Sequence, residues 1–271
     1  MGIMLLEKNG NGEKHMNKTK IEYVNFTWNP VSGCLHGCPY CYAKGIVRRF
    51  APKRWFAGHS GVSEFGHINV IDTPKYENGE LCIYPYGFDP TFHRYRLNEP
   101  AKIKKTQNVF VCSMADLFGD WISEEWIEKV FAACKEAPQH RYLFLTKNPM
   151  RYINLSEKLP LDNNYWFGTT ITKETDYYFF SDKHNTFLSI EPIQGAFQVC
   201  HDLKAKWVII GAETGNRKDK IVPKRKWIEA IVENCRENKM PVFLKNNLKD
   251  IWKEPLIQET PWDIEWRPEE A

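Results

Sequence analysis

Residues 109–145 read VFVCSMADLFGDWISEEWIEKVFAACKEAPQHRYLFL, and this stretch indicates the fold class. Residues 109–112 and 142–145 are short, continuous apolar runs, which is typical of strands that are covered on both faces. Between them, residues 123–137 carry apolar side chains at helical spacing, and Ser123 is expected to cap the start of that helix. A strand, a helix and a second strand in this order predict a parallel βαβ unit.

The same alternation continues on both sides of this stretch. Further apolar runs predict strands at residues 21–26, 166–169, 187–190, 207–210 and 242–244. A second helical stripe, which includes Ile228, Ile231 and Cys235, follows Pro223. We therefore predict an α/β protein whose parallel strands form a partial (β/α)6 TIM-like barrel, with an open doubly wound sheet as the alternative.

Composition along the chain suggests a leader, one domain with an insertion, and a tail. Residues 1–20 are polar and lack the apolar segment of a secretion signal, so we interpret them as a disordered leader or tag. Residues 21–253 are expected to form the barrel domain, and residues 254–271 a C-terminal tail. Within the domain, residues 53–107 are rich in Gly, Pro, His and aromatic residues, which predicts an irregular insertion after the first βα unit.

The overall composition narrows the class of protein. Of the 271 residues, 42% are hydrophobic and 26% are charged, which excludes wholesale disorder. No apolar run approaches the ~20 residues of a membrane-spanning helix, so no membrane partner is expected. The formal net charge of +3 permits an anionic partner without requiring one. Eight cysteines without a secretion signal predict reduced thiols and a cytoplasmic location.

Three of the cysteines, Cys34, Cys38 and Cys41, have the spacing C-x3-C-x2-C on a segment that also contains glycines and a proline. Three thiolates on one compact loop converge on one metal centre, and the favoured interpretation is an iron–sulfur cluster. The alternatives are zinc with His36 as the fourth ligand, a disulfide plus one thiol, and a buried structural trio. Three protein ligands leave one iron of a [4Fe–4S] cluster open for chemistry.

This motif, with the aromatic Tyr40 just before its last cysteine, resembles that of the radical S-adenosylmethionine (SAM) superfamily. The resemblance implies that Cys34, Cys38 and Cys41 hold a [4Fe–4S] cluster and that SAM binds the remaining iron. It implies reductive cleavage of SAM to a 5′-deoxyadenosyl radical that abstracts hydrogen from a substrate, with Tyr40 near the adenine. It also implies an external electron donor of the flavodoxin or ferredoxin type.

A narrower resemblance extends over nearly the whole chain after Lys20. Several blocks are ordered as in a phage and bacterial three-Cys-motif family of unknown function, the gene-product 37/68 family of phages. They are residues 27–30, 113–118, 137–140, 145–149, 188–192, 211–215 and 243–245. The resemblance supplies no substrate, but it implies a three-Cys-motif partner protein as one candidate partner.

Polar residues end nearly every predicted strand. They are Asp116, Lys147, Thr170, Glu191, Glu213 and Lys245. In a parallel barrel such residues converge on one mouth with the cysteine loop, whereas the alternative interpretation makes them helix caps and rim salt bridges. We predict catalytic roles for Asp116, Lys147, Glu191 and Lys245. The residues predicted to bind SAM are Tyr40, Ser113, Asp116, Thr170, Glu191 and Glu213. This chain lacks the Gly-Gly-Glu-like segment of the superfamily, so Ser113, backbone carbonyls or Asp116 would replace it.

The substrate is open at this level. Basic residues near aromatic ones, such as Arg48, Arg49 and Arg54, and another basic patch at residues 224–226 make a nucleic-acid base or nucleotide the first hypothesis. A solvated basic face is the alternative and the more common explanation of such patches. A peptide or protein substrate is the second hypothesis, and a non-catalytic zinc or Fe–S binding module is the third. His59, His67 and His93 are weaker candidate metal ligands, because their spacing matches no known set.

Overall fold

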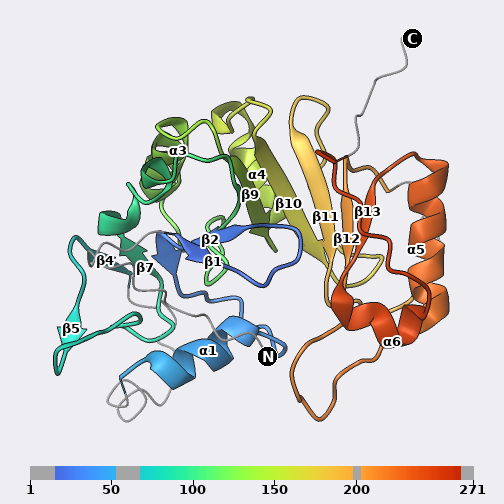
Figure 1. Ribbon diagram of the computed structural model, residues 1–271, viewed down its shortest axis with the longest axis horizontal. Coiled ribbons are helices and arrows are strands. Elements are labelled where there is room, and N and C mark those ends of the chain that lie inside the picture. Colours follow the sequence, from blue (N-terminus) through green and yellow to red (C-terminus); the bar gives the residue numbers. More distant parts are fainter. Residues whose placement is uncertain (1–15, 53–67, 198–202, 264–271) are drawn as a thin grey trace. The chain divides into compact units, whose positions relative to one another are not determined.

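The structure, a computed structural model, describes residues 16–52, 68–197 and 203–263. It divides into two compact units, residues 1–151 and residues 152–271, which we call the first and the second unit and describe separately (Figure 1). Among the described residues the longest helix, α5 (Arg225–Glu237), has 13 residues, fewer than the ~20 that cross a bilayer.

The first unit contains a sheet with the order β1-β2-β8-β9. Its strands are β1 (Asn17–Lys18), β2 (Phe26–Trp28), β8 (Asn108–Val111) and β9 (Arg141–Thr146). The strands β2, β8 and β9 are parallel, and β1 is antiparallel to β2. The carboxyl ends of the three parallel strands therefore lie at one edge, which is where functional residues collect in α/β sheets.

Two helices of the first unit pack their apolar faces on this framework. In α3 (Glu124–Lys135), the Phe131 ring lies 5.4 Å from the Phe144 ring of β9, measured between centroids. Ser123 occupies the predicted N-cap position, but its side chain makes no capping hydrogen bond. The helix α1 (Tyr42–Phe50) begins after Cys41 and buries Ala43 and Val47.

The described part of the predicted insertion, residues 68–107, is less irregular than expected. A small sheet has the order β3 (Val31–Ser32), β7 (Thr91–His93), β4 (Asn69–Ile71), and β5 (Tyr76–Glu77) pairs with β6 (Glu80–Leu81). Two 3-10 helices follow, η1 (Arg94–Arg96) and η2 (Pro100–Lys102). A buried ion pair between Arg96 and Glu99, 2.9 Å apart, stabilises this segment. Residues 53–67 lie outside the described residues.

The second unit is a four-stranded parallel sheet with the order β10-β11-β12-β13. The strands are β10 (Tyr165–Ile171), β11 (Asn185–Ile190), β12 (Val208–Ile210) and β13 (Val242–Leu244). The helix α5 lies beside β12 and β13 (Figure 1), and its Ile228, Ile231 and Cys235 belong to the same buried core as Val208 and Val242. Shorter helices are α4 (Pro149–Asn154), η3 (Ser156–Lys158), η5 (Asn246–Leu248) and α6 (Lys249–Trp252).

The α/β class with mostly parallel strands is confirmed, whereas the partial barrel itself stays a prediction. The strand expected at residues 21–26 was misplaced, because residues 19–25 form the loop that joins antiparallel β1 to β2. Residues 16–18 of the supposed leader belong to the fold, since Met16 is buried and β1 pairs with β2. In the supposed tail, residues 257–259 pair with β13: Leu244 N donates to the Ile257 carbonyl over 2.7 Å, and Glu259 N donates to the Val242 carbonyl over 3.1 Å.

Candidate metal centre

The cysteine loop follows β3 and is held by backbone hydrogen bonds. Gly33 N donates to the Met114 carbonyl over 2.9 Å, and Cys34 N donates to the Phe88 carbonyl over 3.2 Å. Gly33 has a φ of +86°, and a Cβ there would lie 2.2 Å from the Asp89 carbonyl oxygen. Only glycine fits this close approach, so the residue before the first cysteine fixes where the loop turns.

The three cysteines of the motif line one small pocket. The other lining residues are His36, Gly37, Lys44 and Phe88, and the open space, counted out into solvent, is about 260 Å³. Cys34, Cys38 and Cys41 are half-buried free thiols. Cys41 is also the N-cap of α1, and its Sγ accepts a hydrogen bond from Lys44 N at 3.5 Å. All three cysteines of the motif are thus lining residues of one space.

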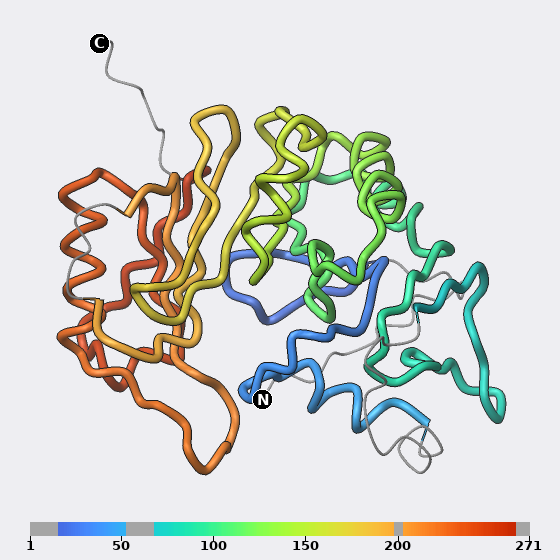
Figure 2. The backbone as a smooth tube through the Cα atoms, turned by 180° about the vertical axis from the view of Figure 1, so that it is seen from behind, coloured from blue at the N-terminus to red at the C-terminus, as the bar shows by residue number. Residues whose placement is uncertain are grey.

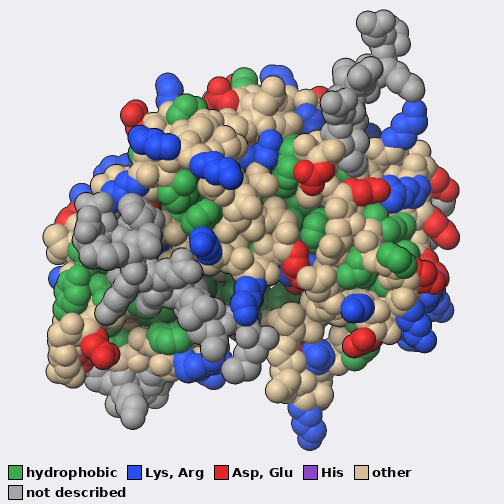
Figure 3. All heavy atoms as spheres, in the orientation of Figure 1, with side chains coloured by type: hydrophobic (Ala, Val, Ile, Leu, Met, Phe, Trp, Pro, Cys, Tyr) green, Lys and Arg blue, Asp and Glu red, His purple; other side chains and the backbone are tan. Residues whose placement is uncertain are grey.

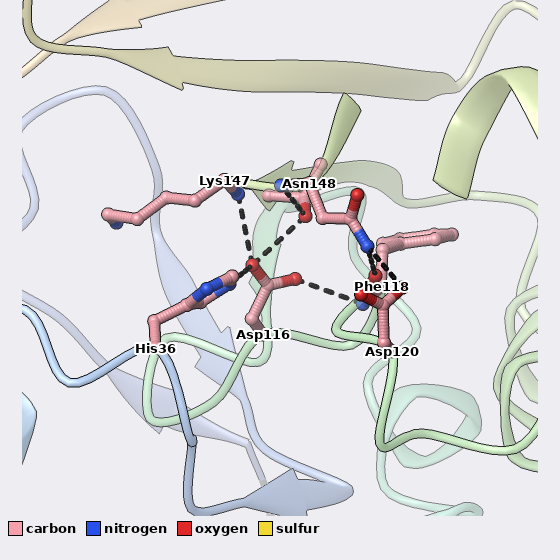
Figure 4. A network of polar contacts seen from close by, with 7 residues as sticks. His36, Asp116, Phe118, Asp120, Lys147 and Asn148 are labelled. Carbon is pink, nitrogen blue, oxygen red and sulfur yellow. Dashed lines mark hydrogen bonds and ion pairs between the residues drawn. The ribbon is translucent and has the colours of Figure 1, made fainter. Parts of the chain in front are cut away.

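His36, between the first two cysteines, is fixed by a buried carboxylate. Its Nε2 lies 2.7 Å from Oδ2 of Asp116, which comes from the segment after β8 (Figure 4). The Trp121 ring meets the imidazole edge-on at 4.9 Å between centroids. A Cβ at Gly119 would lie 2.3 Å from the Trp121 ring, so this glycine makes room for the tryptophan that supports His36.

Asp116 joins the cysteine loop to the ends of two strands. Besides His36, its Oδ2 accepts hydrogen bonds from Thr146 Oγ1 at 2.9 Å and Lys147 N at 3.0 Å, and its Oδ1 accepts from Phe118 N at 3.0 Å. Burial acts to raise the pKa of Asp116, but the bonds from His36, Lys147 and Thr146 outweigh it and hold the pKa below its ordinary value. The carboxylate is therefore ionised and fully bonded, which suits positioning better than catalysis.

Burial and the charges around Cys34 change the pKa of its thiol, which must lose its proton when it binds a metal ion. Burial first, and then the charges of Asp116 and Cys41, raise the pKa of the Cys34 thiol to about 12, while the His36 N–H and the Lys147 ammonium act in the opposite direction. A thiol that binds a metal ion releases its proton to the solvent, so a bound cation reverses this local bias. Lys147 is exposed, and Figure 4 shows its side chain turned away from Asp116.

The segment after β8 is fastened beside the same loop. Asn29 Oδ1 accepts from Ser113 Oγ at 3.2 Å and from Met114 N at 3.0 Å. The Tyr42 hydroxyl donates to the Ser113 carbonyl over 2.5 Å. Ser113 and Tyr40 are both half-buried. The predicted SAM-binding Ser113 is thus held next to the cysteine loop by Asn29, a residue that the sequence did not single out.

In the second unit, an ion pair lies across the end of β12. Lys245 Nζ is 2.6 Å from Glu191 Oε1, and these residues follow β13 and β11, the two neighbours of β12. A Cβ at Gly211 would lie 3.0 Å from both Glu191 Cδ and Lys245 Cδ, so the missing side chain leaves room for the pair. Asn247 holds the next residue, Ala212, through its backbone N–H and carbonyl.

A second ion pair follows β12. Glu213 binds Arg217 through two hydrogen bonds of 2.7 and 2.8 Å. These bonds lower the pKa of Glu213, and burial opposes them. In β10, Thr170 is buried, and its hydroxyl has no hydrogen-bond partner among the described residues.

The predicted site residues therefore fall into two sets. Asp116, Lys147 and Ser113 lie with the cysteine loop in the first unit; Tyr40 is on that loop. The others, Thr170, Glu191, Glu213 and Lys245, lie at strand ends in the second unit, and their roles stay predictions. The sequence analysis did not predict that His36, Asn29 and Trp121 help to position the cysteine loop. The location of His36 inside the cysteine motif was the one sequence feature that could have indicated such a role.

The weaker histidine candidates do not form a metal site in the described residues. His93 is buried, with Nε2 2.7 Å from Ser32 Oγ, and burial followed by the charge of Arg96 lowers its pKa to about 3. His59 and His67, like Arg54, lie outside the described residues. Across the described ranges, no three His, Cys, Asp or Glu side chains are arranged to hold a single metal ion.

The residue types that line the cysteine pocket nevertheless fit a three-cysteine iron–sulfur cluster. In the pocket, the ligand types are three thiols and His36, whose Nε2 is bonded to Asp116. Because Nε2 is bonded to Asp116, Nδ1 is the ring nitrogen of His36 that could serve as the fourth ligand of a zinc ion. Three thiols without a fourth protein ligand match a three-cysteine iron–sulfur cluster with one open iron.

Comparison with known proteins adds a family. Residues 18–254 match the family described as "Protein of unknown function (DUF5131)". No curated protein matches the chain. Among solved structures, a mutant of spore photoproduct lyase is similar with 10% sequence identity and a TM-score of 0.42, over 73% of this chain and 58% of that chain. This chain thus spans less than two thirds of that protein, and so distant a similarity supports no inference about function.

Proposed function

Because the chain belongs to the DUF5131 family, which is described only as proteins of unknown function, we propose its activity from the chemistry of its own cysteine pocket. The protein is a radical SAM enzyme, and Cys34, Cys38 and Cys41 hold its [4Fe–4S] cluster. The observation that carries this proposal is that all three cysteines line one pocket, on a loop tied to the ends of β8 and β9. When bound, the cluster supplies one electron to SAM, whose cleavage gives methionine and a 5′-deoxyadenosyl radical that takes hydrogen from a substrate.

The other residues of the first unit position this centre in the proposal. Asp116 holds the cysteine loop through His36 and is a positioning residue, since its oxygens already accept four hydrogen bonds. Ser113 and Tyr40 are the proposed SAM contacts. Lys147 is the proposed contact to a carboxylate, because its exposed ammonium acts on Cys34 and is not engaged by Asp116.

In the second unit, the proposed ligands for SAM or substrate have different local states. The Thr170 hydroxyl is buried without a partner, so a ligand would satisfy it. Glu191 and Lys245 are engaged with each other, as are Glu213 and Arg217, so a ligand would have to exchange places with one partner.

The test is anaerobic reconstitution with iron and sulfide, followed by iron analysis, electron paramagnetic resonance after dithionite, and detection of 5′-deoxyadenosine from SAM. Cys38→Ala is expected to lose nearly all bound iron and all 5′-deoxyadenosine formation while the protein remains folded. Cys82→Ala, which removes a half-buried cysteine outside the motif, is the matched control and is expected to keep both. Full iron content in Cys38→Ala, or zinc as the metal held by these cysteines, would contradict the proposal.

A further inference from the structure

A helix with a strongly basic surface begins at the cysteine pocket. The helix α1 starts immediately after Cys41, and Lys44 in its first turn lines the pocket itself. Arg48, four residues beyond Lys44, lies on the same side of the helix. Arg48 is seven residues from Cys41, which is about 10 Å along a helix axis. The basic surface therefore lies within a short distance of the thiols.

The charge of this surface is not compensated. Lys44, Arg48 and Arg49 are exposed, and none of them has an acidic partner among the described residues. The helix contains no Asp or Glu, and the sequence contains none between Glu22 and Glu64. The buried side of α1, with Ala43 and Val47, packs on Tyr84 and Met114 instead, so the charged side is left to solvent. Lys and Arg side chains are visible at the lower edge of the molecule, where Figure 1 places α1 (Figure 3).

We propose that this exposed surface of α1, formed by Lys44, Arg48 and Arg49 with the half-exposed ring of Tyr42, is the docking site for an acidic electron-donor protein. The inference rests on the proposed function, since only a redox centre at Cys34, Cys38 and Cys41 needs such a donor. A cluster close to the surface accepts electrons from a partner that docks beside it, and a basic docking surface selects and steers a partner with an acidic rim.

The size of the surface favours a redox protein over a nucleic acid. Electron-transfer encounters use small interfaces and need only a few complementary charges. Proteins that bind nucleic acids typically neutralise about 6–10 phosphates, whereas α1 offers three cations. The Tyr42 ring is also restrained, because its hydroxyl is bonded to the Ser113 carbonyl, so it is not free to adapt to a base.

The electron step balances without a further reactant. A flavin hydroquinone anion of the donor gives up one electron and becomes the neutral semiquinone. The oxidised cluster takes up that electron, and its charge falls by one. No bond to a heavy atom forms or breaks, and no proton has to move.

The experiment uses the full chain and, as the probe, a flavodoxin with acidic residues around its flavin. Calorimetry measures the affinity for the oxidised flavodoxin, and stopped-flow absorbance measures cluster reduction by the hydroquinone form. The double variant Arg48→Glu/Arg49→Glu is expected to lower both affinity and rate at least about 10-fold at low salt, because reversing two charges changes the net charge of the surface by about four units. Reduction by dithionite is expected to stay unchanged.

The second unit offers a matched control. Lys218→Glu/Lys226→Glu makes the same charge change on two exposed lysines, one in the long segment between β12 and α5 (Figure 2) and one at the start of α5, and is expected to leave both readouts unchanged. Equal affinity and rate in the α1 variant and the wild type would overturn the docking site. The docking site would also be overturned if the wild type bound a single-stranded oligonucleotide more tightly than the flavodoxin and the α1 variant abolished that binding. If the wild-type protein forms no cluster, the proposed function and this inference both fail. If dithionite reduces the cluster but the α1 variant has the affinity and rate of the wild type, the inference alone fails.

Discussion

The two units carry similar polar residues at their strand ends but use them differently. In the first unit, Asp116 is buried and accepts four hydrogen bonds, from His36, Thr146 and the backbone. In the second unit, Glu191 and Glu213 each pair with a single cation, and those cations are partly in contact with solvent.

This difference separates residues that position from residues that can respond to a ligand. A buried carboxylate with every oxygen engaged loses much more than it gains by binding anything else, so it fixes a geometry. An ion pair that reaches solvent contributes little to stability and can open at small cost. We therefore interpret Asp116 as a positioning residue, and the Glu191–Lys245 pair, in which both side chains reach solvent, as the group able to rearrange around a ligand.

The largest expected effect tests the role of Asp116. Asp116→Ala leaves the hydroxyl of Thr146, two backbone N–H groups and His36 without their acceptor, so the free energy of unfolding is expected to fall by about 3 kcal/mol. Urea denaturation followed by circular dichroism measures this change. The reconstituted variant is also expected to lose bound iron faster, since the cysteine loop is released from the strand ends.

Two control variants define the comparison. Asp120→Ala removes an exposed carboxylate that accepts one bond from Asn148, and is expected to change stability by less than about 0.5 kcal/mol. Glu191→Ala removes a partly exposed ion pair and is expected to cost about 1 kcal/mol or less. If Glu191→Ala destabilised the protein as much as Asp116→Ala, the distinction between the two units would not hold.

A pair of glycine variants provides the next, smaller effect. In Gly119→Ala the new Cβ would meet the Trp121 ring, which also supports His36, and the expected loss of stability is about 1–3 kcal/mol. In Gly211→Ala the Cβ meets flexible parts of Glu191 and Lys245, which can move, so the expected loss is below about 1 kcal/mol.

Thermal unfolding of these variants gives a direct ranking. Gly45→Ala is the control, because a Cβ at this exposed position of α1 meets nothing within 4 Å. It is expected to stabilise the protein by about 0.5–1 kcal/mol, as alanine does in a helix. A Gly119→Ala protein as stable as the wild type would show that Trp121 does not depend on this glycine.

The local patterns of the sequence predicted a large part of this organisation. Continuous apolar runs located β8 to β13 to within about two residues, because a strand buried on both faces has few other ways to be encoded. The cysteine spacing located the candidate metal centre, since its residues are adjacent in the chain. The predicted strand at residues 21–26 was wrong because the local pattern was ambiguous. Its apolar residues Tyr23 and Val24 are buried, but they belong to a loop and not to a strand.

The contacts that the sequence did not reveal join residues far apart in the chain. His36 and Asp116 are 80 positions apart, and Asn29 and Ser113 are 84 apart, so no periodicity or spacing connects them. The need for a glycine at position 119 becomes visible only once the position of the Trp121 ring is known. The same reason applies to the apparent tail, whose residues 257–259 pair with the edge of β13, which lies more than ten positions earlier in the chain.

The smallest expected effect concerns the pH dependence of the second unit. Hydrogen bonds from Arg217 lower the pKa of Glu213, with burial acting against them. A carboxylate whose pKa falls on folding stabilises the folded protein above its unfolded pKa of about 4.3. That contribution disappears as the pH falls through the lower pKa of the folded state.

Glu213→Gln is therefore expected to flatten the decrease of unfolding free energy between about pH 5 and pH 3, measured by urea denaturation. Arg217→Gln should flatten the same range, because Glu213 then loses the bonds that lower its pKa. An unchanged slope in both variants would show that this ion pair is already open in solution, and the second unit would then hold its ligand-binding groups free rather than paired.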